Sequence, residues 1–156
     1  MSAFPYPPFM TYVTVQDAAR AIDFYTAAFG ARERYRLADE GTGCVGHAEL
    51  DLNGGVLMLS EENPQWGTKS PATLGGSPAK FCLMVENADS ALEKAVAAGA
   101  TLVMPATDMF YGFRNGCVRD PFGFEWMIQH EIESVSPAEM QKRWNAMLAE
   151  GCPPPE

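Results

Sequence analysis

The segment VTVQDAARAIDFYTAAFGA, from Val13 to Ala31, returns further along the chain as LMVENADSALEKAVAAGATLV, from Leu83 to Val103. Val15 of the first copy aligns with Val85 of the second, an offset of 70 residues (85 − 15). Each copy reads as a β-rich run followed by a helix with an apolar stripe that ends at a glycine. Because a repeat of this kind marks a supersecondary module, we predict two similar modules that meet around a cavity.

The first module is predicted to be a strand, a helix and three further strands. Residues 10–15 alternate in a β-rich composition, Asp17 is placed to cap the following helix, and Gly30 is placed to end it. Asn53-Gly54 is the strongest short hairpin signal in the chain. The other strands are predicted at 32–37, 45–52 and 56–60, which places this module at about residues 8–60.

The second module, at about residues 80–130, is predicted to repeat this order. A strand at 81–85 leads into a helix at 88–98, and Pro105 is expected to close the short strand that follows at 102–104. The last two strands are predicted at 117–120 and 124–130, on either side of the turn Pro121-Phe122-Gly123.

Two segments lie outside the modules of what we expect to be a single domain, residues 1–156. Residues 61–79 are rich in proline and glycine, and they form either a lid over a binding site or a plain linker. Ser136 is a capping residue for a helix at 136–149, whose apolar stripe includes Trp144. That stripe must cover either the chain's own sheet or a second subunit.

Composition narrows the classes of partner. The chain has 156 residues, 47% of them hydrophobic, and a formal net charge of −9 with no basic stripe, so nucleic acid and anionic membranes are not expected as partners. No apolar run approaches the roughly 20 residues that cross a bilayer. The start, MSAFPYPPFMTY, lacks the features of a signal peptide, and the four cysteines have no CxxC spacing. We expect a cytoplasmic protein with reduced thiols.

Six segments occur in a fixed order between about residues 8 and 148: YVTVQDAARAIDFYTAAFGA, GHAEL, WGTKSPATLGGSP, AAGATLVMP, RDPFGFEW and VSPAEMQKR. In these segments the chain closely resembles the vicinal oxygen chelate superfamily, which includes glyoxalase I, bleomycin resistance proteins and extradiol dioxygenases, and within it the PhnB-like branch. The resemblance implies an α+β fold in which two βαβββ modules form a half-open, mixed-sheet cup. It also implies that each chain or dimer encloses a cavity.

Metal-dependent members of that superfamily place a ligand on the first strand of each module and another on the last. By the resemblance, those corner positions fall at Met10, Met58, Lys80 and Met127. Thioethers suit soft ions such as Cu(I), and a protonated amine repels a cation, so these side chains do not make the usual divalent metal site. We therefore expect no metal cofactor at the corners.

Three polar residues are candidates for catalysis. His47 and Glu49 share one face of a predicted strand, where they are either a general base with its orienting carboxylate or an exterior pair. Glu125 is either a rim residue or a cavity carboxylate, which would need Lys80 or Arg114 as a partner. Together these three candidates could also rebuild a displaced metal site.

The predicted wall of the cup consists of flexible methionine side chains and aromatic side chains. Methionines at the corners would make an adaptable wall, and loop aromatics would either stack on a flat apolar ligand or form a dimer seam. Arg114 would bind a carboxylate or phenolate, or else be an ordinary surface arginine. The predicted ligand-binding residues are Met10, Met58, Lys80, Met127, Trp66, Tyr111 and Arg114.

These features favour a homodimeric protein that binds a small apolar or aromatic molecule without a metal. One alternative is an enzyme of the same fold (a lyase, isomerase or dioxygenase) that uses His47 and Glu49 or a relocated metal site. Another is a protein-interaction role through the helix that carries Trp144. No GxSxG, HExxH or P-loop motif is present, so machinery for acyl or phosphoryl transfer is not visible.

Overall fold

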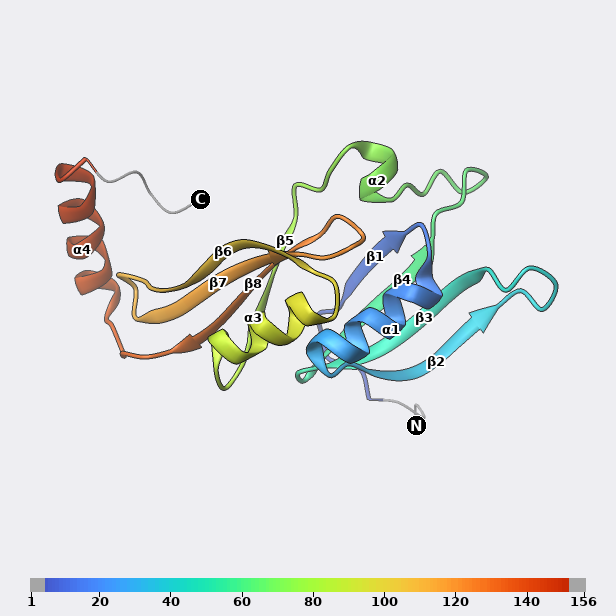
Figure 1. Ribbon diagram of the computed structural model, residues 1–156, viewed down its shortest axis with the longest axis horizontal. Helices are drawn as coiled ribbons and strands as arrows, with labels where there is room; N and C mark the ends of the chain where they lie inside the picture. Colours follow the sequence, from blue (N-terminus) through green and yellow to red (C-terminus); the bar gives the residue numbers. More distant parts are fainter. Residues whose placement is uncertain (1–4, 152–156) are drawn as a thin grey trace.

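A computed structural model describes residues 5–151 and consists of two βαβββ modules that lie side by side (Figure 1). Module 1 contains β1 (Thr11–Val15), α1 (Ala18–Phe29), β2 (Arg32–Ala38), β3 (Val45–Leu52) and β4 (Gly55–Glu61). Module 2 contains β5 (Lys80–Met84), α3 (Ala88–Ala97), β6 (Thr101–Asp108), β7 (Phe113–Arg119) and β8 (Glu125–Glu131). The short helix α2 (Pro71–Leu74) lies between the modules, and α4 (Pro137–Ala149) follows them.

Each module folds its four strands into one mixed sheet. The strand orders are β1-β4-β3-β2 and β5-β8-β7-β6, so the two sheets have the same topology. In each sheet the first strand pairs in parallel with the last, and the remaining pairs are antiparallel. The chain therefore has the predicted α+β fold of two open, mixed sheets.

One face of each sheet is covered by its own helix, and the two helices pack against each other at the centre of the molecule (Figure 1). In α1, the predicted stripe is Ala18, Ile22, Tyr25 and Phe29; the first three are buried in this core and Phe29 packs against it half-buried. The sheets lie side by side, so neither sheet covers the other's uncovered face (Figure 1). We call these two uncovered surfaces the open faces.

A buried carboxylate joins the two modules. Asp120, in the turn before β8, is 4% exposed and accepts hydrogen bonds from the Tyr25 hydroxyl of α1 at 2.8 Å and from Trp126 Nε1 at 2.9 Å. It also accepts from the backbone N–H groups of Phe122 and Phe124, both at 2.9 Å. Four donors therefore satisfy the buried acid and hold the turn against α1.

Local sequence signals correctly predicted several of the residues at which helices and strands begin or end. Asp17 caps α1 by accepting from Arg20 N, and Gly30 ends the helix in the left-handed region. The Asn53-Gly54 turn joins β3 to β4 with φ of 48° and 80°, the positive values that this hairpin type requires. Ser136 caps α4 as predicted, accepting from Glu139 N.

The prediction that Pro105 ends its strand was wrong. β6 runs from Thr101 to Asp108 and passes through Pro105. It is the outermost strand of its sheet, and its pairing with β7 is irregular between Met104 and Thr107. A proline is tolerated at such a place because it is not required to donate a ladder hydrogen bond. β7 also begins at Phe113, earlier than predicted.

The segment between the modules is anchored by Glu62. Its carboxylate accepts from Ser70 N at 2.8 Å and from Thr73 Oγ1 at 2.7 Å, at the start of α2. These hydrogen bonds, first from the Ser70 backbone and then from Thr73, lower the pKa of Glu62 from 4.5 to about 2.

We therefore expect the attachment of α2 to be sensitive to acid. A carboxyl whose pKa is lowered by folding stabilises the folded state fully above its unfolded pKa, 4.5, and loses that contribution as the pH falls toward about 2. The chemical shift of the Ser70 amide should titrate with a midpoint near the lower value and should stop responding in Glu62→Gln. A midpoint near 4.5 would show that Glu62 does not hold α2.

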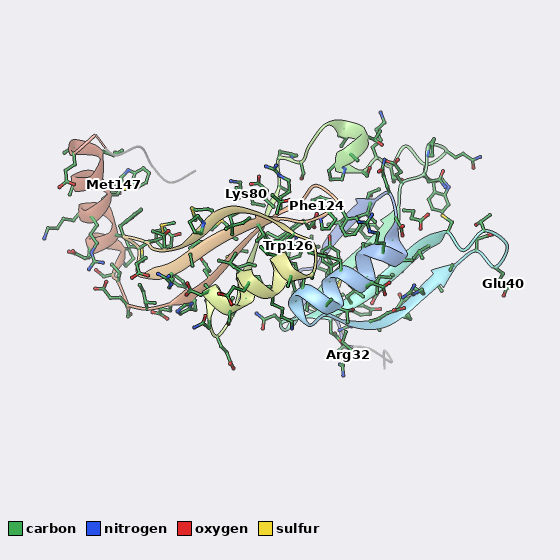
Figure 2. All side chains as sticks on the ribbon, in the orientation of Figure 1. Arg32, Glu40, Lys80, Phe124, Trp126 and Met147 are labelled. Carbon is green, nitrogen blue, oxygen red and sulfur yellow. The ribbon has the colours of Figure 1, made fainter. Side chains whose placement is uncertain are left out.

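Helix α4 stands away from the rest of the chain at one end of the molecule (Figures 1 and 2). Trp144 contacts Phe110, with ring centroids 5.5 Å apart. Arg143 donates to the Phe110 carbonyl at 3.1 Å and to both oxygens of Glu133 at 2.8 Å. No residue of α4 is buried, so its apolar stripe is only partly covered by its own chain.

Candidate functional site

The open face of sheet 1 carries a row of four side chains, one from each strand. Tyr12 of β1 is paired with Met58 of β4, Met58 with Glu49 of β3, and Glu49 with Tyr35 of β2. Because side chains alternate along a strand, His47 lies on the same face as Glu49. The alternation predicted from sequence thus places two of the candidate catalytic residues on an open face.

Glu49 is the centre of this cluster. It is only 2% exposed, yet it lies on the face that no helix covers. Its Oε1 accepts hydrogen bonds from the hydroxyls of Tyr35 at 2.8 Å and Tyr6 at 3.2 Å, and lies 3.3 Å from His47 Nε2. Its Oε2 lies 3.8 Å from Arg34 Nη1 and has no hydrogen-bond partner among residues 5–151.

These contacts keep Glu49 ionised. Burial acts to raise its pKa, but the hydrogen bonds from Tyr35, His47 and Tyr6 outweigh burial, and the pKa lies below its usual value. The same hydrogen bond to Glu49 raises the pKa of Tyr35 well above its ordinary value, which keeps that hydroxyl protonated as a donor. The cluster is therefore an anion that accepts hydrogen bonds from neighbouring side chains, with the Arg34 guanidinium 3.8 Å from its second oxygen.

His47 connects the buried carboxylate to the surface. Its Nδ1 lies 3.2 Å from the hydroxyl of Tyr12, and its ring is flanked by the rings of Tyr12 and Tyr35, at centroid distances of 5.7 and 5.8 Å. Tyr12 is 52% exposed, so its ring forms the outer surface of the cluster. A molecule resting on this face would touch Tyr12 first.

The open face of sheet 2 has an ionic row and a sulfur row. Glu125 lies between two cations, 3.2 Å from Lys80 Nζ and 2.6 Å from Arg119 Nη2, and the hydrogen bond from Arg119 is the main reason that its pKa is lowered. In the next row, Met127 is paired with Cys82 on one side and Cys117 on the other. This face therefore has a row of side chains with a net positive charge beside a row of apolar, sulfur-containing side chains.

A groove of about 640 Å³ separates the adjoining edges of the modules. Lys80 and Trp126 lie near this junction in Figure 2, and both line the groove. Phe9 and Val56 line it from module 1, and Met84 lines it from module 2. The groove meets the open face of sheet 2 along β5, so the two surfaces are continuous there.

The structure does not bring every sequence-predicted residue to these surfaces. Met10 lies just before β1 and is half-buried, and Trp66 is 70% exposed in the loop between the modules. Tyr111, by contrast, is held beside the open face of sheet 2, because Asn115 Nδ2, on the same face of β7 as Cys117, donates to its hydroxyl at 2.9 Å. Arg114 lies on the helix-covered face of β7.

Arg114 is occupied by structural partners. It binds both carboxylate oxygens of Asp89 at the start of α3, each at 2.7 Å, and Asp108 at 2.7 Å. These carboxylates, Asp89 first, raise its pKa above the ordinary arginine value. Arg114 is thus separated from Glu125 and Met127 by the thickness of the sheet.

The side chains at the corner positions do not suit a divalent metal. Met58 lies on the open face of sheet 1, Met127 on that of sheet 2, and Lys80 is bound to Glu125. Thioethers and a paired ammonium are poor ligands for Zn²⁺, Ni²⁺, Fe²⁺ or Mn²⁺. Within the described part of the chain, no three His, Cys, Asp or Glu side chains are grouped so that they could hold an ion.

Comparison with known proteins settles the family. Residues 8–128 match the model of the glyoxalase/bleomycin resistance protein/dioxygenase superfamily. The chain belongs to this superfamily. The predicted resemblance is thereby confirmed at the level of the superfamily, and the topology described above is the one that its members share.

Several known proteins are similar along most of the chain. Protein Mb0911c of Mycobacterium bovis is 39% identical over 148 residues, which cover 93% of this chain and 95% of that protein. The X-ray structure of the Arabidopsis thaliana product At5g48480 has 32% identity and a TM-score of 0.64, over 80% of this chain and 98% of that one. TioX from Micromonospora sp. ML1 has 27% identity and a TM-score of 0.61, over 80% and 99%.

Sequence reasoning missed the tyrosines that surround Glu49 and the cysteines beside Met127. Strand alternation was a usable signal for the cysteines, because Cys82 is two residues from Lys80 and Cys117 is two from Arg119. Tyr12 lies in a predicted strand, but its contact with His47 passes over β4 and depends on the pairing of β1 with β4. That register is not visible in either strand alone.

Proposed function

We propose that this protein binds a small apolar or aromatic molecule between open sheet faces, without a metal ion. The observation that carries the proposal is Glu49, an ionised carboxylate that is almost fully buried on a face that no helix covers. Buried carboxylates with a shifted pKa are concentrated at binding and catalytic sites, which supports a ligand site here. Tyr12 and Met58 provide the apolar contact area beside it.

The cup needs a second wall, and we propose that a second copy of the chain supplies it. Because the two sheets of one chain lie side by side, the open face of sheet 1 in one copy can meet that of sheet 2 in the other. A two-fold axis then produces two equivalent cups. The apolar stripe of α4, which its own chain leaves partly uncovered, is suited to the same assembly.

The two walls would then differ in chemistry. Sheet 1 contributes the tyrosines and the Glu49 cluster, whereas sheet 2 contributes Met127 and the row of Lys80, Glu125 and Arg119. A flat molecule with one polar group fits this pair of walls, because its ring packs on tyrosine and methionine while the polar group meets the ionic row. Trp66 is a further candidate contact if the loop that carries it folds over the cup.

The proposal also covers the branch of the superfamily, the cellular location and the classes of partner. We place the protein in the PhnB-like branch of the superfamily and in the cytoplasm, and its net charge of −9 makes nucleic acid and anionic membranes poor partners on electrostatic grounds. Among residues 5–151, no helix is long and apolar enough to cross a bilayer. In the part of the chain that the structure describes, Cys44, Cys82 and Cys117 form no disulfide.

Calorimetric titration with 2-naphthol tests the proposal. Protein dialysed against a chelator, with its metal content checked, should bind the probe as tightly as protein that was not dialysed. Met58→Asp, which puts a charge on the proposed apolar wall without touching the buried core, should weaken binding at least about tenfold. Loss of binding on dialysis, recovered by adding Zn²⁺ or Ni²⁺, would contradict the metal-free site. Equal affinity of the variant would contradict its location.

A further inference from the structure

Tyr12, His47 and Glu49 form a continuous line of hydrogen bonds from the exposed surface to a buried acid. The Tyr12 hydroxyl lies 3.2 Å from His47 Nδ1, and His47 Nε2 lies 3.3 Å from Glu49 Oε1. The three residues come from two strands, β1 and β3, with β4 between them. This is the geometry of a hydroxyl, an imidazole and a carboxylate in series.

With His47 neutral, the chemistry of the two ends sets the direction of each hydrogen bond. An ionised carboxylate only accepts, so His47 must donate its Nε2–H to Glu49. A neutral imidazole with its proton on Nε2 has an unprotonated Nδ1, which can only accept. Tyr12 must then donate its hydroxyl proton to Nδ1. The lone pairs of the Tyr12 oxygen then remain available to accept a proton.

The surroundings make Glu49 the acceptor at the buried end of this line. Glu49 is held as an anion by the hydroxyls of Tyr35 and Tyr6 and by the Arg34 guanidinium, 3.8 Å from its second oxygen. Asp51, the other carboxylate near this end of the face, is bound to Arg34 at 2.7 Å and to Arg32 at 2.9 Å. Glu49 is therefore the carboxylate that His47 contacts, and it orients the ring.

We propose that this line is a proton relay and that Tyr12 is a catalytic general base for a carbon or oxygen acid held in the cup. The inference rests on the proposed ligand site, because the relay can act only on a molecule that contacts Tyr12. It assigns a chemical class to the ligand: an aromatic or apolar molecule with an acidic C–H next to an electron-withdrawing group, or a phenolic or enolic O–H.

The step balances without any further reagent. The acid gives its proton to the Tyr12 oxygen, and the hydroxyl proton of Tyr12 moves to His47 Nδ1. The products are the conjugate base of the ligand and an imidazolium paired with the Glu49 carboxylate. Return of both protons regenerates the resting protein. No electron leaves the ligand, and no bond between ligand and protein forms.

Ring ¹⁵N NMR of the two histidines tests the relay without a ligand. His130, on the helix-covered face of β8, is an internal reference because its Nδ1 accepts from the Ala88 backbone N–H at 2.9 Å. Resting His47 should carry its proton on Nε2, and Tyr12→Phe should shift the Nδ1 resonance of His47 while leaving both His130 nitrogens unchanged. A proton on Nδ1 of resting His47 would overturn the relay, because Tyr12 could not donate to it.

Base-promoted ring opening of 5-nitro-1,2-benzisoxazole provides the chemical test. A base removes the ring C–H proton, the N–O bond breaks, and a coloured nitrophenolate with a nitrile group is released. The wild-type protein should accelerate this reaction above buffer, and Tyr12→Phe and His47→Gln should each lose between about ten- and a hundredfold. Glu49→Gln should lower the rate and shift its pH profile. His130→Gln is the matched histidine control and should retain the wild-type rate.

The outcomes separate the relay from the ligand site. If 2-naphthol binds but Tyr12→Phe opens the benzisoxazole as fast as the wild type, the relay is wrong and the binding site stands. If 2-naphthol does not bind, the proposed function fails, whatever the NMR result. A wild-type rate equal to buffer, in protein that binds 2-naphthol, also overturns the relay.

Discussion

Asp120→Ala is expected to lower the free energy of unfolding by about 3–5 kcal/mol. The change removes one carboxylate and leaves four donors without their acceptor: the Tyr25 hydroxyl, the Trp126 indole N–H and the N–H groups of Phe122 and Phe124. It also cuts the polar link between α1 of module 1 and the last turn of module 2. Urea unfolding followed by circular dichroism measures the loss.

The effect should be graded by the number of donors left unpaired. Tyr25→Phe removes one donor and keeps the other three bonds, so we expect a loss of only about 1–2 kcal/mol. Asp120→Asn retains one carbonyl oxygen and should fall between the two. If Asp120→Ala and Tyr25→Phe cost the same free energy of unfolding, the backbone bonds to the turn contribute nothing, and the proposed link between the modules is wrong.

Gly112→Ala is expected to cost about 2–4 kcal/mol, because both the backbone angle and the space at this position exclude a side chain. Gly112 has φ +88°, and an added Cβ would collide with the Glu133 carbonyl and come within 2.7 Å of Val135 Cγ2. The Gly112 carbonyl also accepts from the N–H groups of Ile132 and Glu133. The substitution should therefore loosen the start of α4 as well as lower the urea midpoint.

Gly75→Ala is the matched control for this experiment. Gly75 has nearly the same backbone angle, φ +82°, but an added Cβ there meets nothing within 4 Å. Gly75→Ala should lower the free energy of unfolding by only about 1 kcal/mol, the penalty for an alanine in the left-handed region. Hydrogen exchange at the amides of α4 should quicken in Gly112→Ala and stay unchanged in Gly75→Ala. Equal unfolding midpoints for the two variants would mean that residues 133–135 move away from the added methyl group without any loss of stability, which would contradict the prediction.

The fold could be predicted where local chemistry decides it. The caps at Asp17 and Ser136, the stop at Gly30 and the Asn53-Gly54 hairpin each act within a few residues, and each is found where it was expected. Strand β6 could not be predicted in this way. Pro105 interrupts a strand unless that strand is at the edge of a sheet, and edge position is a property of the tertiary structure.

The candidate site was predictable only in part, for a related reason. Alternation along one strand placed His47 beside Glu49, but it could not show that Tyr12 reaches them across β4. The place of Arg114 was likewise not visible in its own segment, because its contact with Asp89 depends on how α3 packs on β7. Contacts within a strand follow from the sequence, whereas contacts between strands follow from the register.

The measurement that tests the central claim most directly is methionine-methyl NMR of chelator-treated protein during titration with 2-naphthol. The claim is that a metal-free cup is formed between the two open faces. The methyl resonances of Met58 on sheet 1 and Met127 on sheet 2 should then shift together, with one dissociation constant. If the probe binds while both resonances stay in place, or if they shift only after a divalent metal is restored, the claim is contradicted.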